Sequence, residues 1–198
     1  LKEKGIGRED FVMLLLPRSP KMFIAMLGVL RAGAAFVFME NSYPEERIRL
    51  IHEDLKVKFT LDLASYEGAM QYSSLPGYEL TDPHDACCSF STSGTTGKPK
   101  TMIQEYGKLD VCLDSWFADV TDLHEEDPQN FGMIFPFNFA AAFVLPLPKL
   151  YAADSIYIMS YDVVKNLVRF EEFLESEYIT EMYLSPSFIR TYKGGYHH

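Results

Sequence analysis

The stretch Ser91-Thr92-Ser93-Gly94-Thr95-Thr96-Gly97-Lys98-Pro99-Lys100 decides how the rest of the chain is interpreted. It directly follows the apolar run 86–90, at the place where α/β sheets carry their ligand loops. Its glycines allow backbone angles that turn consecutive N–H groups toward one anion, and its hydroxyl groups are further donors. Its lysines add positive charge. We therefore predict that this stretch is a phosphate-binding loop between two elements of an α/β fold.

Other interpretations of the loop are weaker. A Ser/Thr/Gly connector without a ligand is the usual meaning of such a composition, but the ordered spacing S-G-T-T-G-K-P-K disfavours it. The P-loop pattern G-x-x-x-x-G-K-[ST] fails at Thr92, where it needs glycine, and at Pro99, where it needs a hydroxyl residue. The dinucleotide pattern G-x-G-x-x-G is absent.

Short apolar runs alternate with amphipathic segments along the whole chain. Runs that are apolar throughout are typical of parallel strands covered on both faces, so we predict an α/β fold with mainly parallel sheets flanked by helices. The expected strands lie at residues 11–16, 34–39, 59–63, 86–90, 131–135 and 155–159. The expected helices begin at Pro20 and Pro44 and cover 106–117 and 163–177, and the inner face of the first holds Met22, Phe23, Met26, Leu27 and Leu30.

Residues 64–83 interrupt this alternation with glycine, serine and proline, which predicts a loop or a connection between subdomains. The expected organisation is therefore 1–83 as one α/β subdomain portion and 84–198 as a second, which carries the phosphate loop. The first residues, Leu1 to Gly5, read like the end of a helix that Gly5 terminates, so we expect further sequence upstream.

Composition excludes several classes of function. A net charge of −10 over 198 residues disfavours nucleic acid as a partner. Cys87, Cys88 and Cys112 have neither zinc nor redox spacing, and adjacent Cys87 and Cys88 are expected to be buried structural thiols in a reducing, cytoplasmic setting. No metal-ligating pattern and no apolar stretch of membrane-spanning length occurs, so we expect no metal held by the protein alone and no membrane partner.

The loop resembles the phosphate-loop signature of the adenylate-forming (AMP-binding) ligase superfamily. This superfamily includes acyl-CoA synthetases, nonribosomal peptide synthetase adenylation domains and D-alanine–D-alanyl carrier protein ligases. The stretches Leu30–Val37 and Ser42–Ile48 resemble the upstream motif of its amino-acid-activating branch. Pro136–Phe139 and Ser185–Phe188 are most similar to the D-alanyl carrier protein ligases. The similarity covers nearly the whole chain in the family's order.

This resemblance implies an N-terminal fragment of an ATP-dependent carboxylate–AMP ligase, with ATP and Mg²⁺ as cofactors. Such an enzyme forms an acyl- or aminoacyl-adenylate and passes the acyl group to a carrier-protein or CoA thiol. No side chain of this fragment is expected to act as a covalent catalyst, and the fragment alone is expected to be inactive. The residues implied to bind the nucleotide are Thr92, Ser93, Gly94, Thr95, Thr96, Gly97 and Lys98.

Some positions depart from the family pattern. Thr101 follows the last lysine of the loop, where glycine is usual, and Ala153 and Asp154 stand where a later motif has glycines. Phe139 and Ala140 are implied to line the acyl pocket, and Ala140 stands where amino-acid-activating relatives have an aspartate. Because a methyl group cannot pair with a buried ammonium, the alignment favours a substrate without an α-amino group. A non-catalytic binding domain on the same fold remains the alternative.

Overall fold

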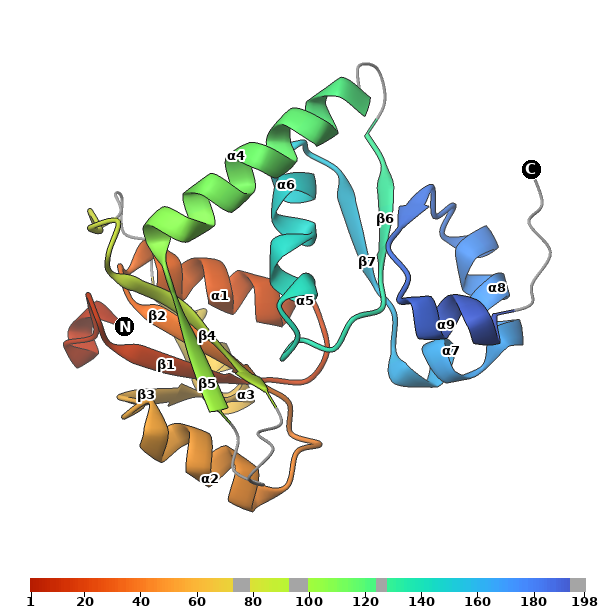
Figure 1. Cartoon of the computed structure of the whole chain (residues 1–198). Helices are drawn as coiled ribbons and strands as arrows, with labels where there is room; N and C mark the ends of the chain where they lie inside the picture. Colours follow the sequence, from red (N-terminus) through yellow and green to blue (C-terminus); the bar gives the residue numbers. More distant parts are fainter. Residues whose placement is uncertain (73–78, 93–99, 124–127, 193–198) are drawn as a thin grey trace. The chain divides into compact units, whose positions relative to one another are not determined.

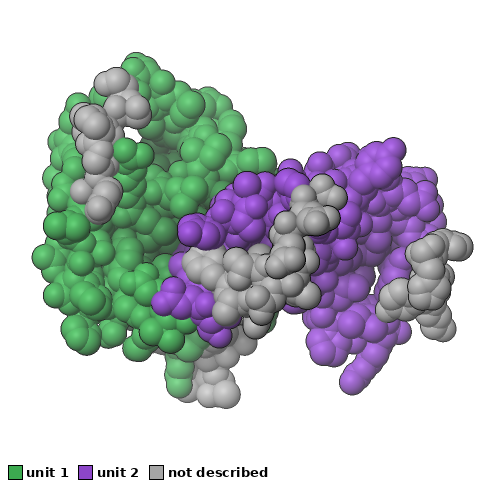
Figure 2. All heavy atoms as spheres, turned by 90° about the horizontal axis from the view of Figure 1, so that it is seen from above, with its two compact units in different colours: residues 1–112, 137–140 green, residues 113–136, 141–198 purple. Residues whose placement is uncertain are grey.

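A computed structural model describes residues 1–72, 79–92, 100–123 and 128–192, and within these ranges the side chains of Thr92 and of residues 116–123 are left out. The chain forms two compact units (Figure 2). The first contains Leu1–Cys112 and Phe137–Ala140, and the second contains Leu113–Pro136 and Ala141–His198. Each unit is described by itself below.

A five-stranded sheet of order β3-β1-β2-β4-β5 is the centre of the first unit (Figure 1). β1 pairs in parallel with β2 and β3, and β2 pairs in parallel with β4, whereas β5 is antiparallel to β4. The strands are β1 (Phe11–Leu15), β2 (Ala35–Met39), β3 (Phe59–Leu61), β4 (Ala86–Thr92) and β5 (Lys100–Glu105). The carboxyl ends of the four parallel strands therefore lie at one edge.

Helices cover both faces of this sheet. They are the 3₁₀ helix η1 (Lys2–Lys4), α1 (Lys21–Arg31), α2 (Glu45–Asp54) and α3 (Leu63–Ala69). α1 and α2 lie on opposite faces (Figure 1). The core on the α2 side is built from Phe11, Met13, Val37, Met39, Ile51 and Leu55. The alternate residues of β1 and β2, such as Val12 and Phe36, are also completely buried, which explains why both strands read as continuous apolar runs.

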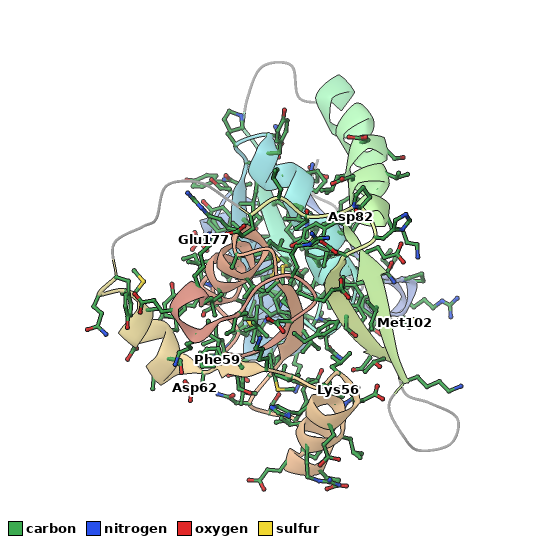
Figure 3. All side chains as sticks on the ribbon, turned by 90° about the vertical axis from the view of Figure 1, so that its left-hand side faces the viewer. Lys56, Phe59, Asp62, Asp82, Met102 and Glu177 are labelled. Carbon is green, nitrogen blue, oxygen red and sulfur yellow. The ribbon has the colours of Figure 1, made fainter. Side chains whose placement is uncertain are left out.

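The expected loop at 64–83 is wrong in its first part, because α3 occupies Leu63–Ala69. Asp62 caps this helix by accepting a hydrogen bond of 2.8 Å from the backbone N–H of Ser65, and these contacts with Ser65 lower the pKa of its carboxyl group. Figure 3 labels Asp62 close to Phe59 of β3. The helix is short and has one buried large side chain, Tyr66, so it has little of the apolar periodicity that reveals a helix in a sequence.

The second unit is built on a three-stranded parallel sheet of order β7-β6-β8. Its strands are β6 (Asn130–Met133), β7 (Ser155–Ile158) and β8 (Glu181–Met182). Its helices are α5 (Ala141–Val144), α6 (Pro146–Tyr151), α7 (Tyr161–Lys165), α8 (Leu167–Ser176) and α9 (Pro186–Thr191), while α4 (Tyr106–Leu123) runs from one unit into the other. Phe170 is fully buried in its core, with ring centroids 5.1 Å from Phe188 and 5.4 Å from Tyr192.

The predicted α/β class with mainly parallel sheets is confirmed. The inner face expected for α1 is partly wrong, because Leu27 is 46% exposed and Val29 is buried in its place. The helix expected at 163–177 is interrupted at Asn166, whose side chain caps α8. The expected division at residues 83/84 stays a prediction, and the first compact unit continues past that point, where β4 pairs with β2.

Candidate functional site

The loop predicted to bind phosphate connects β4 to β5. Ser93, Gly94, Thr95, Thr96, Gly97 and Lys98 lie outside the described residues. The two ends of the loop are described: Ser91 pairs with Thr101 and Thr92 pairs with Lys100 in the antiparallel ladder. The loop thus begins at the carboxyl end of a parallel strand, the edge where open α/β sheets bind ligands.

Phe137–Ala140, which includes the residues expected to line an acyl pocket, belongs to the same unit and lies at the same edge. Glu40, the residue directly after β2, is buried and its Oε1 accepts a hydrogen bond of 3.2 Å from the backbone N–H of Phe137. Val37 of β2 pairs with Ser89 of the parallel strand β4. Glu40 comes three residues after Val37 and Thr92 comes three residues after Ser89, so the two residues stand at the same level of the sheet. The start of the loop and the segment 137–140 therefore share one edge of the sheet.

Phe137 fixes this segment on the α1 face of the sheet. Its ring is fully buried, with centroids 5.4 Å from Phe23 and 5.3 Å from Phe38, and the guanidinium of Arg18 lies 5.5 Å from its centroid. The next residues turn outward: Phe139 is 57% exposed, and Ala140 is exposed in the turn before α5. Their assignment to an acyl pocket stays a prediction.

Polar side chains follow β4 and β5 on the face covered by α2. The Nη2 atom of Arg47 lies 3.5 Å from Ser91 Oγ. On the paired strand, Thr101 Oγ1 donates a hydrogen bond to Asp54 Oδ2 at the other end of α2. Thr101 stands where the family usually has glycine, so this departure adds a polar contact between α2 and β5. Helix α2 is therefore joined to both strands that carry the loop.

Two residues of this edge were missed by the sequence reasoning, Glu40 and Arg47. Glu40 could have been found, because a charged residue directly after a fully apolar strand stands at the ligand-binding edge of a parallel sheet. Arg47 belongs to a recognised motif, but its place near Ser91 depends on how α2 packs on the sheet. Burial raises the pKa of neighbouring Tyr43, Glu40 raises it further, and Arg47 opposes this shift.

The opposite, amino-terminal end of β4 is held by charge pairs. Arg8 donates two hydrogen bonds to Asp85, of 2.7 Å from Nε and 2.9 Å from Nη2. These bonds, and a bond from the backbone N–H of Asp82, lower the pKa of the Asp85 carboxyl group. Glu9 accepts a hydrogen bond of 2.7 Å from the backbone N–H of Ala86. These contacts fix the start of the strand and lie at the wrong end for a ligand loop.

The cysteines on β4 are structural. Cys87 and Cys88 are both fully buried, as expected, with their Sγ atoms 3.7 Å apart. The pairing register with β5 shifts between Ala86 and Cys88, which makes Cys87 the extra residue of a β-bulge. In the part of the chain that the structure describes, no three His, Cys, Asp or Glu side chains are grouped to hold a metal ion. None of the described helices combines the length and apolar character needed to cross a bilayer.

A cavity of about 630 Å³ lies elsewhere in the first unit. It is lined by residues of η1, α1, β3 and α3, among them Ile24, Phe59, Tyr66 and Met70. Its described lining contains no residue of β4 or β5. Its position at the β3 side of the sheet therefore separates it from the candidate phosphate site.

The sequence of this chain is similar to those of known proteins. Residues 1–76 match the profile of a family described as AMP-binding enzyme. The chain is 33% identical to tyrocidine synthase 2 of Brevibacillus parabrevis over 95% of this chain and 6% of that protein. It is 29% identical to gramicidin S synthase 1 of Brevibacillus brevis over 94% of this chain and 18% of that protein. The chain thus spans less than a fifth of these curated relatives.

Solved structures show the same fold. The N-terminal subdomain of NpsA from Klebsiella oxytoca, in complex with 3-hydroxyanthranilyl-AMSN, superposes with a TM-score of 0.78 at 22% identity, over 96% of this chain and 50% of that one. NpsA-ThdA, an artificially fused adenylation–PCP di-domain, gives a TM-score of 0.79 at 21% identity, over 96% of this chain and 40% of that one. Residues 1–76 thus match the AMP-binding enzyme family, and the chain has the fold of part of the NpsA N-terminal subdomain.

Proposed function

We propose that this chain is the phosphate-binding part of an ATP-dependent ligase that joins a carboxylic acid to AMP. The observation that carries the proposal is the position of the hydroxyl- and lysine-containing loop at the carboxyl end of β4. In the proposed reaction the substrate carboxylate attacks the α-phosphate of ATP, an acyl-adenylate forms, and pyrophosphate leaves. A thiol then accepts the acyl group and AMP is released.

The loop residues would act by position and charge. Thr92, Ser93, Thr95, Thr96 and Lys98 would donate hydrogen bonds to the β- and γ-phosphates, with Gly94 and Gly97 giving the backbone room to approach. Charge stabilisation of this kind is the usual protein contribution to reactions at phosphorus. Mg²⁺ is commonly bound through one or two carboxylates together with substrate phosphates, so we propose that it arrives with ATP. No covalent intermediate on this chain is required.

The class of carboxylic acid is proposed from two residue positions, and the thiol acceptor from the similarity to known proteins. Phe139 and Ala140 would line the acyl pocket, and Ala140 favours an acid without an α-amino group. The similarity to tyrocidine synthase 2 and to the NpsA-ThdA fusion supports a carrier-protein thiol as the acceptor. A CoA thiol, and a D-alanyl carrier protein ligase type, are further candidates. Three free cysteines fit a reducing, cytoplasmic setting.

Pyrophosphate–ATP exchange by the full-length protein tests this proposal. Lys98→Ala should reduce exchange about a hundred-fold or more, because a donor aimed at developing charge is lost. Lys108→Ala is a matched control, since Lys108 is an exposed lysine of α4 whose Nζ lies 3.7 Å from Glu105. Equal activity of the wild type and the Lys98→Ala protein would remove Lys98 from the site.

A non-catalytic binding domain is the second candidate, favoured by the departures at Ala140, Ala153 and Asp154. It predicts a full-length protein that binds ATP but shows no exchange with any carboxylic acid. The enzyme proposal predicts exchange by the full-length protein and none by residues 1–198 alone, because the chain covers about half of the NpsA subdomain. Turnover by the 198-residue chain would contradict the view that more of the domain is needed.

A further inference from the structure

Arg47 stands apart from the other arginine on its helix. Its Nε is buried and has no hydrogen-bond partner among the described residues, and no described carboxylate lies within ion-pair distance of it. Arg49, two residues later, is fully engaged, with Nη2 2.7 Å from Glu46 and Nη1 2.6 Å from Glu53. A partly buried guanidinium without an anion is unfavourable, which indicates that Arg47 serves a ligand rather than the fold.

The position of Arg47 identifies the class of that ligand. Its Nη2 lies 3.5 Å from Oγ of Ser91, the residue two positions before the undescribed part of the loop. Ser89 pairs with Val37, whose side chain lies in the core on the α2 side of the sheet. Side chains two residues apart on a strand point to the same face, so Ser89 and Ser91 both face α2. The Oγ of Ser89 is buried and has no described hydrogen-bond partner. The guanidinium therefore lies at the start of the loop, on a face of the strand that offers hydroxyl groups.

The guanidinium plane is also held in place. Its carbon lies 4.9 Å from the ring centroid of Tyr43, and this ring packs against the core formed with α2. Stacking on an aromatic ring fixes the plane of an arginine, and a fixed guanidinium presents several N–H donors in the fork that matches phosphate oxygens. A lysine at this position would supply the positive charge without the planar set of N–H donors.

We propose that Arg47 is an additional binding residue for the phosphate chain of the nucleotide and for the pyrophosphate that leaves. This inference rests on the proposed function, because it takes the adjoining loop as the phosphate site. In a chain of net charge −10, one cation at the start of the loop would attract the polyphosphate and offset its charge. Arg47 would thereby lower the Kd of ATP and of pyrophosphate without contacting the carboxylic acid.

The test uses the full-length protein and the variants Arg47→Ala, Arg47→Gln, Arg47→Lys, Ser91→Ala and Arg49→Ala. Calorimetry gives the Kd of inorganic pyrophosphate with Mg²⁺, and exchange gives separate KM values for ATP and for the acid. Loss of Arg47 should weaken pyrophosphate binding and raise the ATP KM about ten- to a hundred-fold, the usual effect of one charge-assisted hydrogen bond. Arg47→Lys should give a pyrophosphate Kd and an ATP KM between those of the wild type and of Arg47→Ala. Arg49→Ala should leave both values unchanged, and no variant should change the KM of the acid.

Each result decides the inference. Unchanged pyrophosphate affinity in Arg47→Gln, which keeps the aliphatic stem and a polar end but removes the charge, would overturn it even if Arg47→Ala failed to fold. A loss in Ser91→Ala equal to that in Arg47→Ala would overturn direct contact, because Arg47 would then act only by holding Ser91. Wild-type protein that binds pyrophosphate through Arg47 but shows no exchange would refute the proposed function and support the inference. Wild-type protein that binds neither ATP nor pyrophosphate would overturn both.

Discussion

Substitution of Ala153 by glycine should stabilise the protein, because Ala153 occupies a backbone conformation that favours glycine. Its φ is +63°, in the left-handed region. It follows Ala152, the C-cap of α6, and its N–H donates to Leu150 O at 3.3 Å, while Asp154 N–H donates to Lys149 O at 2.9 Å. This is the Schellman pattern, in which the residue after the C-cap is usually glycine.

Two opposing effects set the change in the free energy of unfolding for Ala153→Gly. A left-handed conformation costs a residue with a Cβ roughly 1–2 kcal/mol, and glycine removes this cost. Glycine also makes the unfolded chain more flexible, which offsets about 0.4–1 kcal/mol of the gain. Ala153 is exposed, so removing its methyl group loses little buried surface. The expected net stabilisation is therefore about 0.5–1 kcal/mol.

Urea unfolding followed by circular dichroism measures this difference from the midpoint at constant slope. Ala152→Gly is the matched control, since Ala152 is next to it, makes up the C-cap of the same helix and has φ −71°. That variant should lose about 0.5–1 kcal/mol, because glycine gains nothing from a right-handed conformation. A loss of stability in both variants would refute the argument from the backbone angle.

Four further substitutions test other parts of the structure. Lys149→Met should destabilise the protein by about 3–5 kcal/mol in urea unfolding, because Lys149 is 1% exposed and its removal leaves the buried carboxylate of Asp154 without its cation. Glu181→Gln should cost clearly less, since Glu181 retains 24% exposure of its side chain. The carboxyl pKa of Asp85 is lowered by Arg8, so its contribution to stability is present above the pKa of the unfolded chain, about pH 4, and is lost as pH falls through the lower folded value. Asp85→Asn should therefore be less stable than wild type at neutral pH and lose less stability on acidification, as measured by urea midpoints across the acid range. Ala140→Asp in the full-length protein should shift exchange at least about tenfold toward an α-amino acid over its deamino analogue, and no shift would mean that residue 140 does not face the substrate.

The fold was predictable where burial is complete. β1 and β2 are buried on both faces, so their sequences are continuous apolar runs. Gly33, directly after the end of α1, has a positive φ of 74°, a conformation that favours glycine. β5 was missed because half of its residues are exposed and it has no regular alternation. The break at Asn166 was missed because a capping side chain changes the path of the chain without changing its hydrophobic pattern.

The candidate site was predictable in part, for a similar reason. The loop is encoded locally, in one segment whose residue types match one chemistry, so the sequence alone could predict it, and its role stays a prediction. Glu40 and Phe137 meet through a hydrogen bond between residues 97 positions apart. Arg47 reaches Ser91 across 44 positions. Such contacts depend on strand order and helix packing, which hydrophobic periodicity does not determine.

Thr101, Asp154 and Ala153, which depart from the family pattern, differ in their local contacts. Thr101 gains a hydrogen bond to Asp54, and Asp154 is buried with its Oδ1 accepting a bond of 2.7 Å from the backbone N–H of Gln129. Ala153 alone keeps a strained backbone. A domain that binds no anion gains nothing from an arginine whose Nε is buried without a described hydrogen-bond partner beside the predicted phosphate loop, because an apolar residue at position 47 would avoid that cost. The buried Nε of Arg47, which has no hydrogen-bond partner among the described residues, therefore favours a chain that binds an anion over a non-catalytic remnant.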